Sequence, residues 1–67
     1  MSKRAVEQAL VALIAEAKKE GVDIGKISKA AIDGILGNEP YTWIQAQDKP
    51  AAMDALKGAL EKNGINI

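Results

Sequence analysis

The chain is predicted to fold as an all-α domain, a compact bundle of three to five short helices joined by turns that contain Gly and Pro. Its apolar residues recur at intervals of three and four, which is the period of one face of a helix. Gly or Pro stands wherever that period is interrupted. A chain of 67 residues is long enough for one domain, 1–67, and too short for a second.

The first expected helix covers residues 2–20 and has the clearest pattern. Its apolar face is built from residues spaced by four, three and four: Val6, Leu10, Leu13 and Ala17. Ser2 is expected to cap the beginning of this helix. Gly21 follows a last turn rich in lysine and is expected to end the helix in the left-handed conformation.

The second expected helix covers residues 28–36. Ser28 is of a type that caps helices, and Ile27 before it stands where a hydrophobic staple residue would pack. Gly37 is expected to stop the helix. Gly34 lowers its stability by about 1 kcal/mol relative to Ala, so we interpret this glycine as a site where another helix packs closely.

Two further helices are expected in the second half of the chain. A short one over 40–47 would begin with a proline at its first position, and a longer one over 50–63 begins in the same way. Gly64 is expected to end the longer helix and to bring Ile65 into contact with Leu60.

The apolar faces of these helices are expected to form an aliphatic core, with Trp43 as its largest single contributor. The other expected core residues are Val6, Leu10, Leu13, Ile14, Ile27, Ile32, Ile35, Leu36, Ile44, Leu56 and Leu60.

The composition argues against catalysis and against bound metal. The chain contains no His and no Cys, which excludes a disulfide and removes the usual ligands of structural zinc. General acid–base catalysis at neutral pH usually uses His or a carboxyl or lysine with a strongly shifted pKa. A chain this short has little interior in which to shift one. We therefore expect no catalytic residues, no cofactor and no enzymatic activity.

The net charge is zero, so no long-range field draws the chain to nucleic acid or to anionic lipid. The apolar stretch near the beginning of the sequence is free of charge only over 8–15, about half of what a membrane span needs. Charged residues follow it where a signal peptide would have a cleavage site. We expect a cytoplasmic protein without membrane contact.

Residues 28–65 resemble the helix-turn-helix of repressor-type DNA-binding domains. Leu36-Gly37 match the turn, Ile32 matches a buried position of the first helix, and Thr42-Trp43 match the recognition helix. The resemblance implies a transcriptional regulator that binds duplex DNA. However, residues 30–48 contain three acids and no Lys or Arg, a net charge of −3. DNA affinity depends largely on cations that neutralise phosphates, so DNA binding is our alternative hypothesis.

Our first hypothesis interprets the same region as an acidic and aromatic surface that binds a protein partner. The candidate partner-binding residues are Asp33, Glu39, Tyr41, Gln45, Gln47 and Asp48. Aromatic residues are enriched where interfaces concentrate their binding energy. Carboxylates on a small scaffold could occupy a basic groove and compete with nucleic acid. Trp43 could serve as an anchor there, or it could belong to the core as described above.

In size and character the chain is similar to the small anti-CRISPR inhibitors of bacteriophages and other mobile elements. This similarity implies a non-enzymatic inhibitor that blocks a nucleic-acid-handling host complex. The expected partner is then a protein, such as an effector complex that binds nucleic acid, and the chain itself is a monomer or a homodimer.

Overall fold

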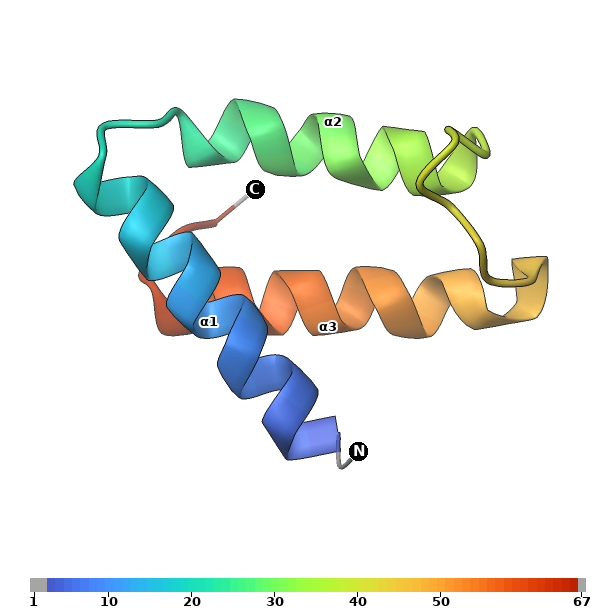
Figure 1. Cartoon of the computed structure of the whole chain (residues 1–67), viewed down its shortest axis with the longest axis horizontal. Coiled ribbons are helices and arrows are strands. Elements are labelled where there is room, and N and C mark those ends of the chain that lie inside the picture. The colour runs from blue at the N-terminus through green and yellow to red at the C-terminus, as the bar shows by residue number, and fades with distance from the viewer. Residues whose placement is uncertain (1–2, 67) are drawn as a thin grey trace.

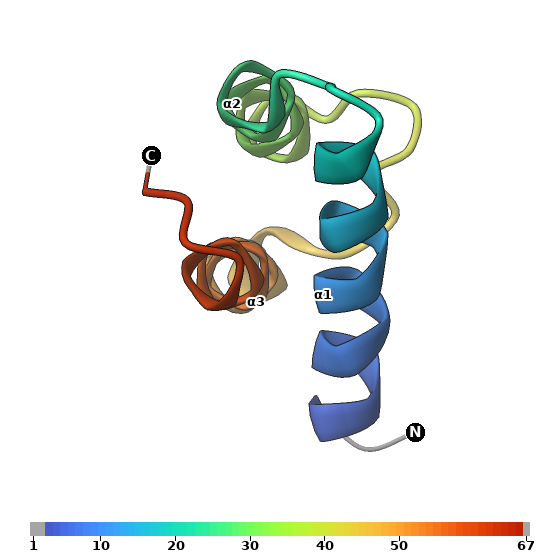
Figure 2. The same cartoon turned by 90° about the vertical axis from the view of Figure 1, so that its left-hand side faces the viewer.

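The computed structural model describes residues 3–66, and all its regular elements in that range are helical, which confirms the predicted all-α class (Figure 1). The elements in chain order are α1 (Lys3–Lys19), α2 (Ile24–Leu36), one 3-10 turn η1 (Ala46–Asp48) and α3 (Lys49–Lys62). Helices α2 and α3 run side by side in opposite directions. Helix α1 crosses them near the start of α2 and the end of α3 (Figures 1 and 2). The expected cap Ser2 lies outside the described residues.

The three α-helices all end in the same left-handed turn. Gly21 and Gly64 adopt φ angles of 78° and 74°, as predicted for both. After α2 the left-handed residue is Asn38, with φ 59°, while Gly37 adopts φ −90°. In each turn an N–H donates to the carbonyl five residues earlier: Val22 to Ala17 at 3.3 Å, Glu39 to Gly34 at 2.8 Å and Ile65 to Leu60 at 2.9 Å.

The expectation that Ser28 caps the second helix is wrong, because α2 begins four residues earlier. Asp23 is the capping residue, and its Oδ1 accepts a hydrogen bond from the backbone N–H of Lys26 at 3.2 Å. Ser28 lies one turn into the helix and is buried. Ile27 is exposed on the helix surface, so it does not form the expected staple.

The expected helix over residues 40–47 does not form. The chain there is irregular and only Ala46–Asp48 make a 3-10 turn. Tyr, Thr, Trp and Ile follow Pro40 in succession, and aromatic and β-branched residues are weaker helix formers. A segment this short also pays the full nucleation penalty. Thr42 instead bonds locally, with its N–H donating to the carbonyl of Glu39 at 2.7 Å.

The core is small and lies where α1 crosses α3. Its buried apolar residues are Ile14, Ile24, Ala59 and Leu60, and the partly buried Leu10, Val11, Ala17, Leu56 and Ile65 pack against them. Asn63 joins the two helices, since its Nδ2 donates to the carbonyl of Val11 at 3.2 Å. Its own carbonyl accepts from Lys18 Nζ at 3.1 Å.

Five residues expected in the core are exposed instead. They are Val6, Leu13, Ile27, Leu36 and Trp43. The physical reason is the arrangement of the helices: α1 contacts α3 with one side of its apolar face, which leaves the side that carries Val6 and Leu13 uncovered. Two thin helices and a crossing third cannot cover every apolar residue of a chain this short.

Candidate partner-binding surface

The loop of residues 37–48 connects α2 to α3 at the end of the molecule away from the α1–α2 turn (Figure 1). Lys49, the first residue of α3, ties the beginning of this loop to its end. Lys49 Nζ donates to Asn38 Oδ1 at 2.8 Å and to the carbonyl of Leu36 at 3.3 Å. Lys49 is only 9% exposed, so the loop is attached to α3 by a buried lysine. A cation at this position also suits the negative C-terminal end of α2.

Gly34 provides the second attachment of the loop. The hydroxyl end of the Tyr41 ring occupies the space where a β-carbon on residue 34 would stand. The hydroxyl of Thr42 donates to the carbonyl of Gly34 at 3.2 Å. The glycine is therefore a site of close packing, but the expectation that a helix packs there is wrong. The packing partner is this loop, whereas a neighbouring helix would be the usual one.

Between these attachments, Trp43 projects into solvent with 89% of its surface exposed. Tyr41 is 58% exposed although its hydroxyl end lies on Gly34. Tryptophan is among the more deeply buried residue types on average, so an uncovered one is informative. We refer to residues 39–45, which carry both aromatic side chains, as the aromatic loop.

The structure leaves all six predicted partner-binding residues exposed: Asp33, Glu39, Tyr41, Gln45, Gln47 and Asp48. They divide into three groups. Glu39 and Tyr41 lie against Gly34 of α2, whereas Gln45, Gln47 and Asp48 lie where the chain enters α3. Asp33 is on α2 itself, one residue before Gly34, and consecutive helix residues project in different directions.

The three acids of this region are free of ion pairs among the described residues. The ion pairs in residues 3–66 join Lys19 to Glu16 and Lys62 to Glu7, both away from the aromatic loop. Asp48 precedes α3 but its side chain makes no capping hydrogen bond. Asp33, Glu39 and Asp48 thus present uncompensated negative charge on the surface.

The segment that the helix-turn-helix resemblance assigns to the recognition helix has no α-helical conformation. Residues 37–48 separate α2 from α3, whereas a helix-turn-helix joins its two helices by about three or four residues. Residues 30–48 also offer no Lys or Arg to phosphates. No observation on this surface favours contact with duplex DNA.

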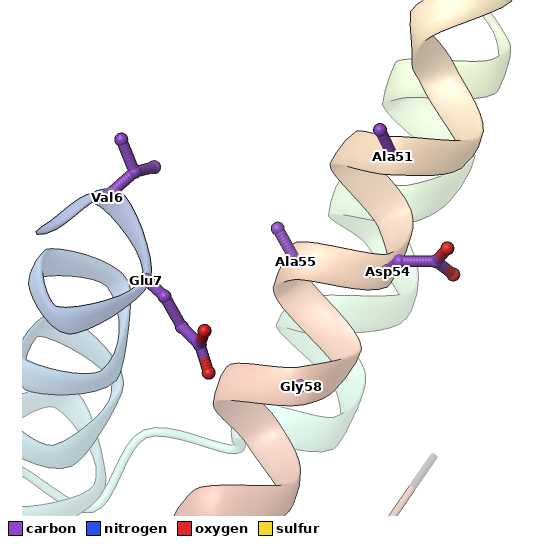
Figure 3. Close-up of a pocket in the computed structure, with 6 residues that line it drawn as sticks. All are labelled: Val6, Glu7, Ala51, Asp54, Ala55 and Gly58. Atoms are coloured by element: carbon purple, nitrogen blue, oxygen red, sulfur yellow. The ribbon is translucent and has the colours of Figure 1, made fainter. Parts of the chain in front are cut away.

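A second surface feature is a shallow hollow of about 470 Å³ between the beginning of α1 and α3 (Figure 3). Small residues of α3 form its floor, and Glu7 reaches across it towards Gly58 while Asp54 points away from α1. Glu7 is already paired with Lys62 at 3.0 Å. The two carboxylates therefore diverge and do not form a pair suited to acid–base catalysis.

No group of three His, Cys, Asp or Glu residues in the described range could hold a metal ion. In the same range, none of the helices is both long and apolar enough to cross a membrane.

The sequence patterns missed the exposure of the apolar residues on α1 and α2. One signal was available for Trp43, because Thr42, Trp43 and Ile44 follow Pro40 without helical periodicity. For Leu13 no such signal existed, since it belongs to a regular helical stripe, and Ile27 stood where a staple residue would be expected to pack. Which side of a stripe is covered depends on how the helices cross.

Comparisons with known proteins were negative: no protein-family model, curated protein or solved structure significantly matches the chain.

Proposed function

We propose that the chain is a non-enzymatic protein-binding module that docks on a basic protein surface through the aromatic loop and its flanking acids. The exposure of Trp43 is the observation that carries this proposal. Leaving an indole in water forfeits the stabilisation of about 1.5–3 kcal/mol that burying a large apolar side chain supplies. A partner that covers Trp43 recovers it, which is how aromatic anchors concentrate binding energy.

The charge of the region specifies the chemistry of the partner. Asp33, Glu39 and Asp48 make no ion pair with any other residue that the structure describes, and the nearest lysine in sequence, Lys49, is buried beneath the loop. A surface rich in Arg and Lys complements them and gains association rate from the attraction. Such surfaces are typical of proteins that hold nucleic acid.

The function that we infer is therefore inhibition by occupancy of a nucleic-acid-binding groove. In a phage or mobile-element setting this is the behaviour of anti-CRISPR inhibitors. The chain would compete with nucleic acid for a basic groove and would perform no chemistry of its own. The rigid attachments of the loop, at Lys49 and at Gly34, support this role because a pre-ordered loop loses little entropy on binding.

The test compares four forms of the tagged chain as bait for basic proteins of its native cytoplasm. They are the native chain, Trp43→Ala, the triple reversal of Asp33, Glu39 and Asp48 to Lys, and a matched reversal of Glu20, Asp54 and Glu61 to Lys. The control acids are also exposed and outside the ion pairs of residues 3–66. Circular dichroism should show the same helix content in all four.

We expect the native chain and the control reversal to capture the same basic protein, and the other two forms to lose it. The captured protein should then release its nucleic acid when native chain is added. If capture survives both Trp43→Ala and the triple reversal, the aromatic loop is not the binding surface. Binding of duplex DNA by the chain alone, tight at low salt and falling steeply with salt, would support the alternative hypothesis of a DNA-binding regulator.

A further inference from the structure

An apolar groove of about 380 Å³ lies between α1 and α2, separate from the aromatic loop. Leu13 and Ala17 of α1 form one wall, Ile27 and Ala31 of α2 form the other, and Leu56 of α3 lies at its base. Its described lining residues are all uncharged, and Ser28 supplies the polar side chain among them. Leu13 is 67% exposed and Ile27 is 54% exposed, so both walls carry large apolar side chains in water.

The chain exposes more surface than a compact monomer of the same mass would. The accessible surface is 4959 Å². A compact monomer of 7.1 kDa is expected to expose about 4,100 Å², so the excess is about 900 Å². The radius of gyration of 11.8 Å also exceeds the value of about 10.9 Å for a compact domain of this length. One partner of a standard interface buries about 800 Å², which is close to the excess.

The small size of the core indicates which partner covers the groove. Only four buried apolar residues form the core among residues 3–66, and domains this small commonly depend on association to stay folded. If folding depends on a partner that covers the groove, that partner must be present whenever the chain is present. A second copy of the chain meets this condition without any other component. Since the net charge is zero, two copies also meet without overall repulsion.

We propose that two copies of the chain associate by packing their α1–α2 grooves against each other. A two-fold pairing uses the same patch on both subunits. One symmetric contact therefore covers Leu13 and Ile27 of both copies. The result is a small helical bundle in which the apolar stripes of α1 and α2, solvated in one copy, become its shared interior.

Helix α2 provides a matched pair of positions for the test. Ile27 is 54% exposed and Leu36 is 53% exposed, but only Ile27 lines the groove. The two are about two and a half turns apart and so lie on opposite faces of the helix. Ile27→Lys therefore places a charge in the proposed interface, while Leu36→Lys places the same charge on the other side.

The experiment measures the mass in solution by sedimentation equilibrium over a wide concentration range. We expect the native chain to approach twice 7.1 kDa, with a melting temperature that rises with protein concentration. Leu36→Lys should behave in the same way. Ile27→Lys should raise the dimer dissociation constant by at least about 100-fold, since an interface that must bury a lysine loses several kcal/mol.

A native chain that stays at 7.1 kDa up to its solubility limit, or Leu36→Lys and Ile27→Lys that weaken the dimer equally, would overturn the proposal. If Ile27→Lys does not fold, Leu13→Lys repeats the test from the opposite wall, at a position even more exposed in one copy. Trp43→Ala should leave the dimer intact, so the result does not depend on the function proposed for the aromatic loop.

Discussion

Replacement of Lys49 by Met tests the idea that a buried lysine holds the aromatic loop. Methionine retains most of the apolar length of the side chain and removes only the ammonium group. The variant therefore lacks the hydrogen bonds from Nζ to Asn38 Oδ1 at 2.8 Å and to the carbonyl of Leu36 at 3.3 Å. All other contacts of the loop, including those at Gly34, remain available.

The expected loss follows from these two bonds. A hydrogen bond with a charged partner contributes about 1.5–3 kcal/mol, but the variant also no longer has to desolvate an ammonium group. Asn38 is exposed, so water can satisfy its Oδ1 once the lysine is gone. We therefore expect the free energy of unfolding to fall by about 1–2 kcal/mol, which lowers the melting temperature by about 4–16 °C for a domain of this size.

The assay combines urea unfolding followed by circular dichroism with fluorescence anisotropy of Trp43, the only tryptophan of the chain. The anisotropy should fall in the folded variant because the loop gains freedom. The control is Lys57→Met on the exposed side of the same helix, which should change stability by less than about 0.5 kcal/mol. Equal effects of the two replacements, or unchanged anisotropy in Lys49→Met, would refute the role assigned to Lys49.

Three further substitutions test the exposure and backbone geometry described above. Trp43→Ala should change the free energy of unfolding by less than about 0.5 kcal/mol, because the side chain is 89% exposed; a core tryptophan would lose about 3–5 kcal/mol. Gly58→Ala should stabilise the protein by about 1 kcal/mol, because the nearest atom to the new β-carbon, Glu7 Oε1, is at an ordinary 3.9 Å. Gly64→Ala should destabilise it by about 1–2 kcal/mol, because its φ of 74° is strained for Ala although the space is open. Urea unfolding of each variant measures all three.

The features of the fold that depend on a few neighbouring residues were predictable from the sequence. The ends of the first and last helices, at Gly21 and Gly64, follow from local backbone preference and agree with the structure. The end of α2, where Asn38 and not Gly37 is left-handed, shows the limit of this reasoning. Either residue could adopt the left-handed conformation, and the contact of Asn38 with Lys49, eleven positions away, favours the arrangement seen.

The features that depend on distant contacts could not be predicted in this way. A stripe such as that of Leu10 and Leu13 indicates an apolar face, but not which part of it another helix covers. Helix α3 covers the side of α1 that contains Ile14, and Leu13 next to it stays exposed. The candidate site residues are exposed in the structure, as charged and amide side chains are in most folds. The backbone conformation of residues 40–47 was not predicted correctly, since Pro40 suits a turn as well as the start of a helix.

The two proposals are compatible in space and together have a consequence for binding. The groove is lined by the first half of α2 together with α1, whereas the aromatic loop follows the end of α2. A dimer closed over the groove would therefore leave both copies of Trp43 exposed. Two loops fixed on one rigid body bind a target with two basic sites more tightly than one loop does, by a factor that can reach about 10²–10⁴ when the spacing matches. Ile27→Lys should then weaken binding to such a target without touching the loop, and it should leave binding to a single-site target unchanged.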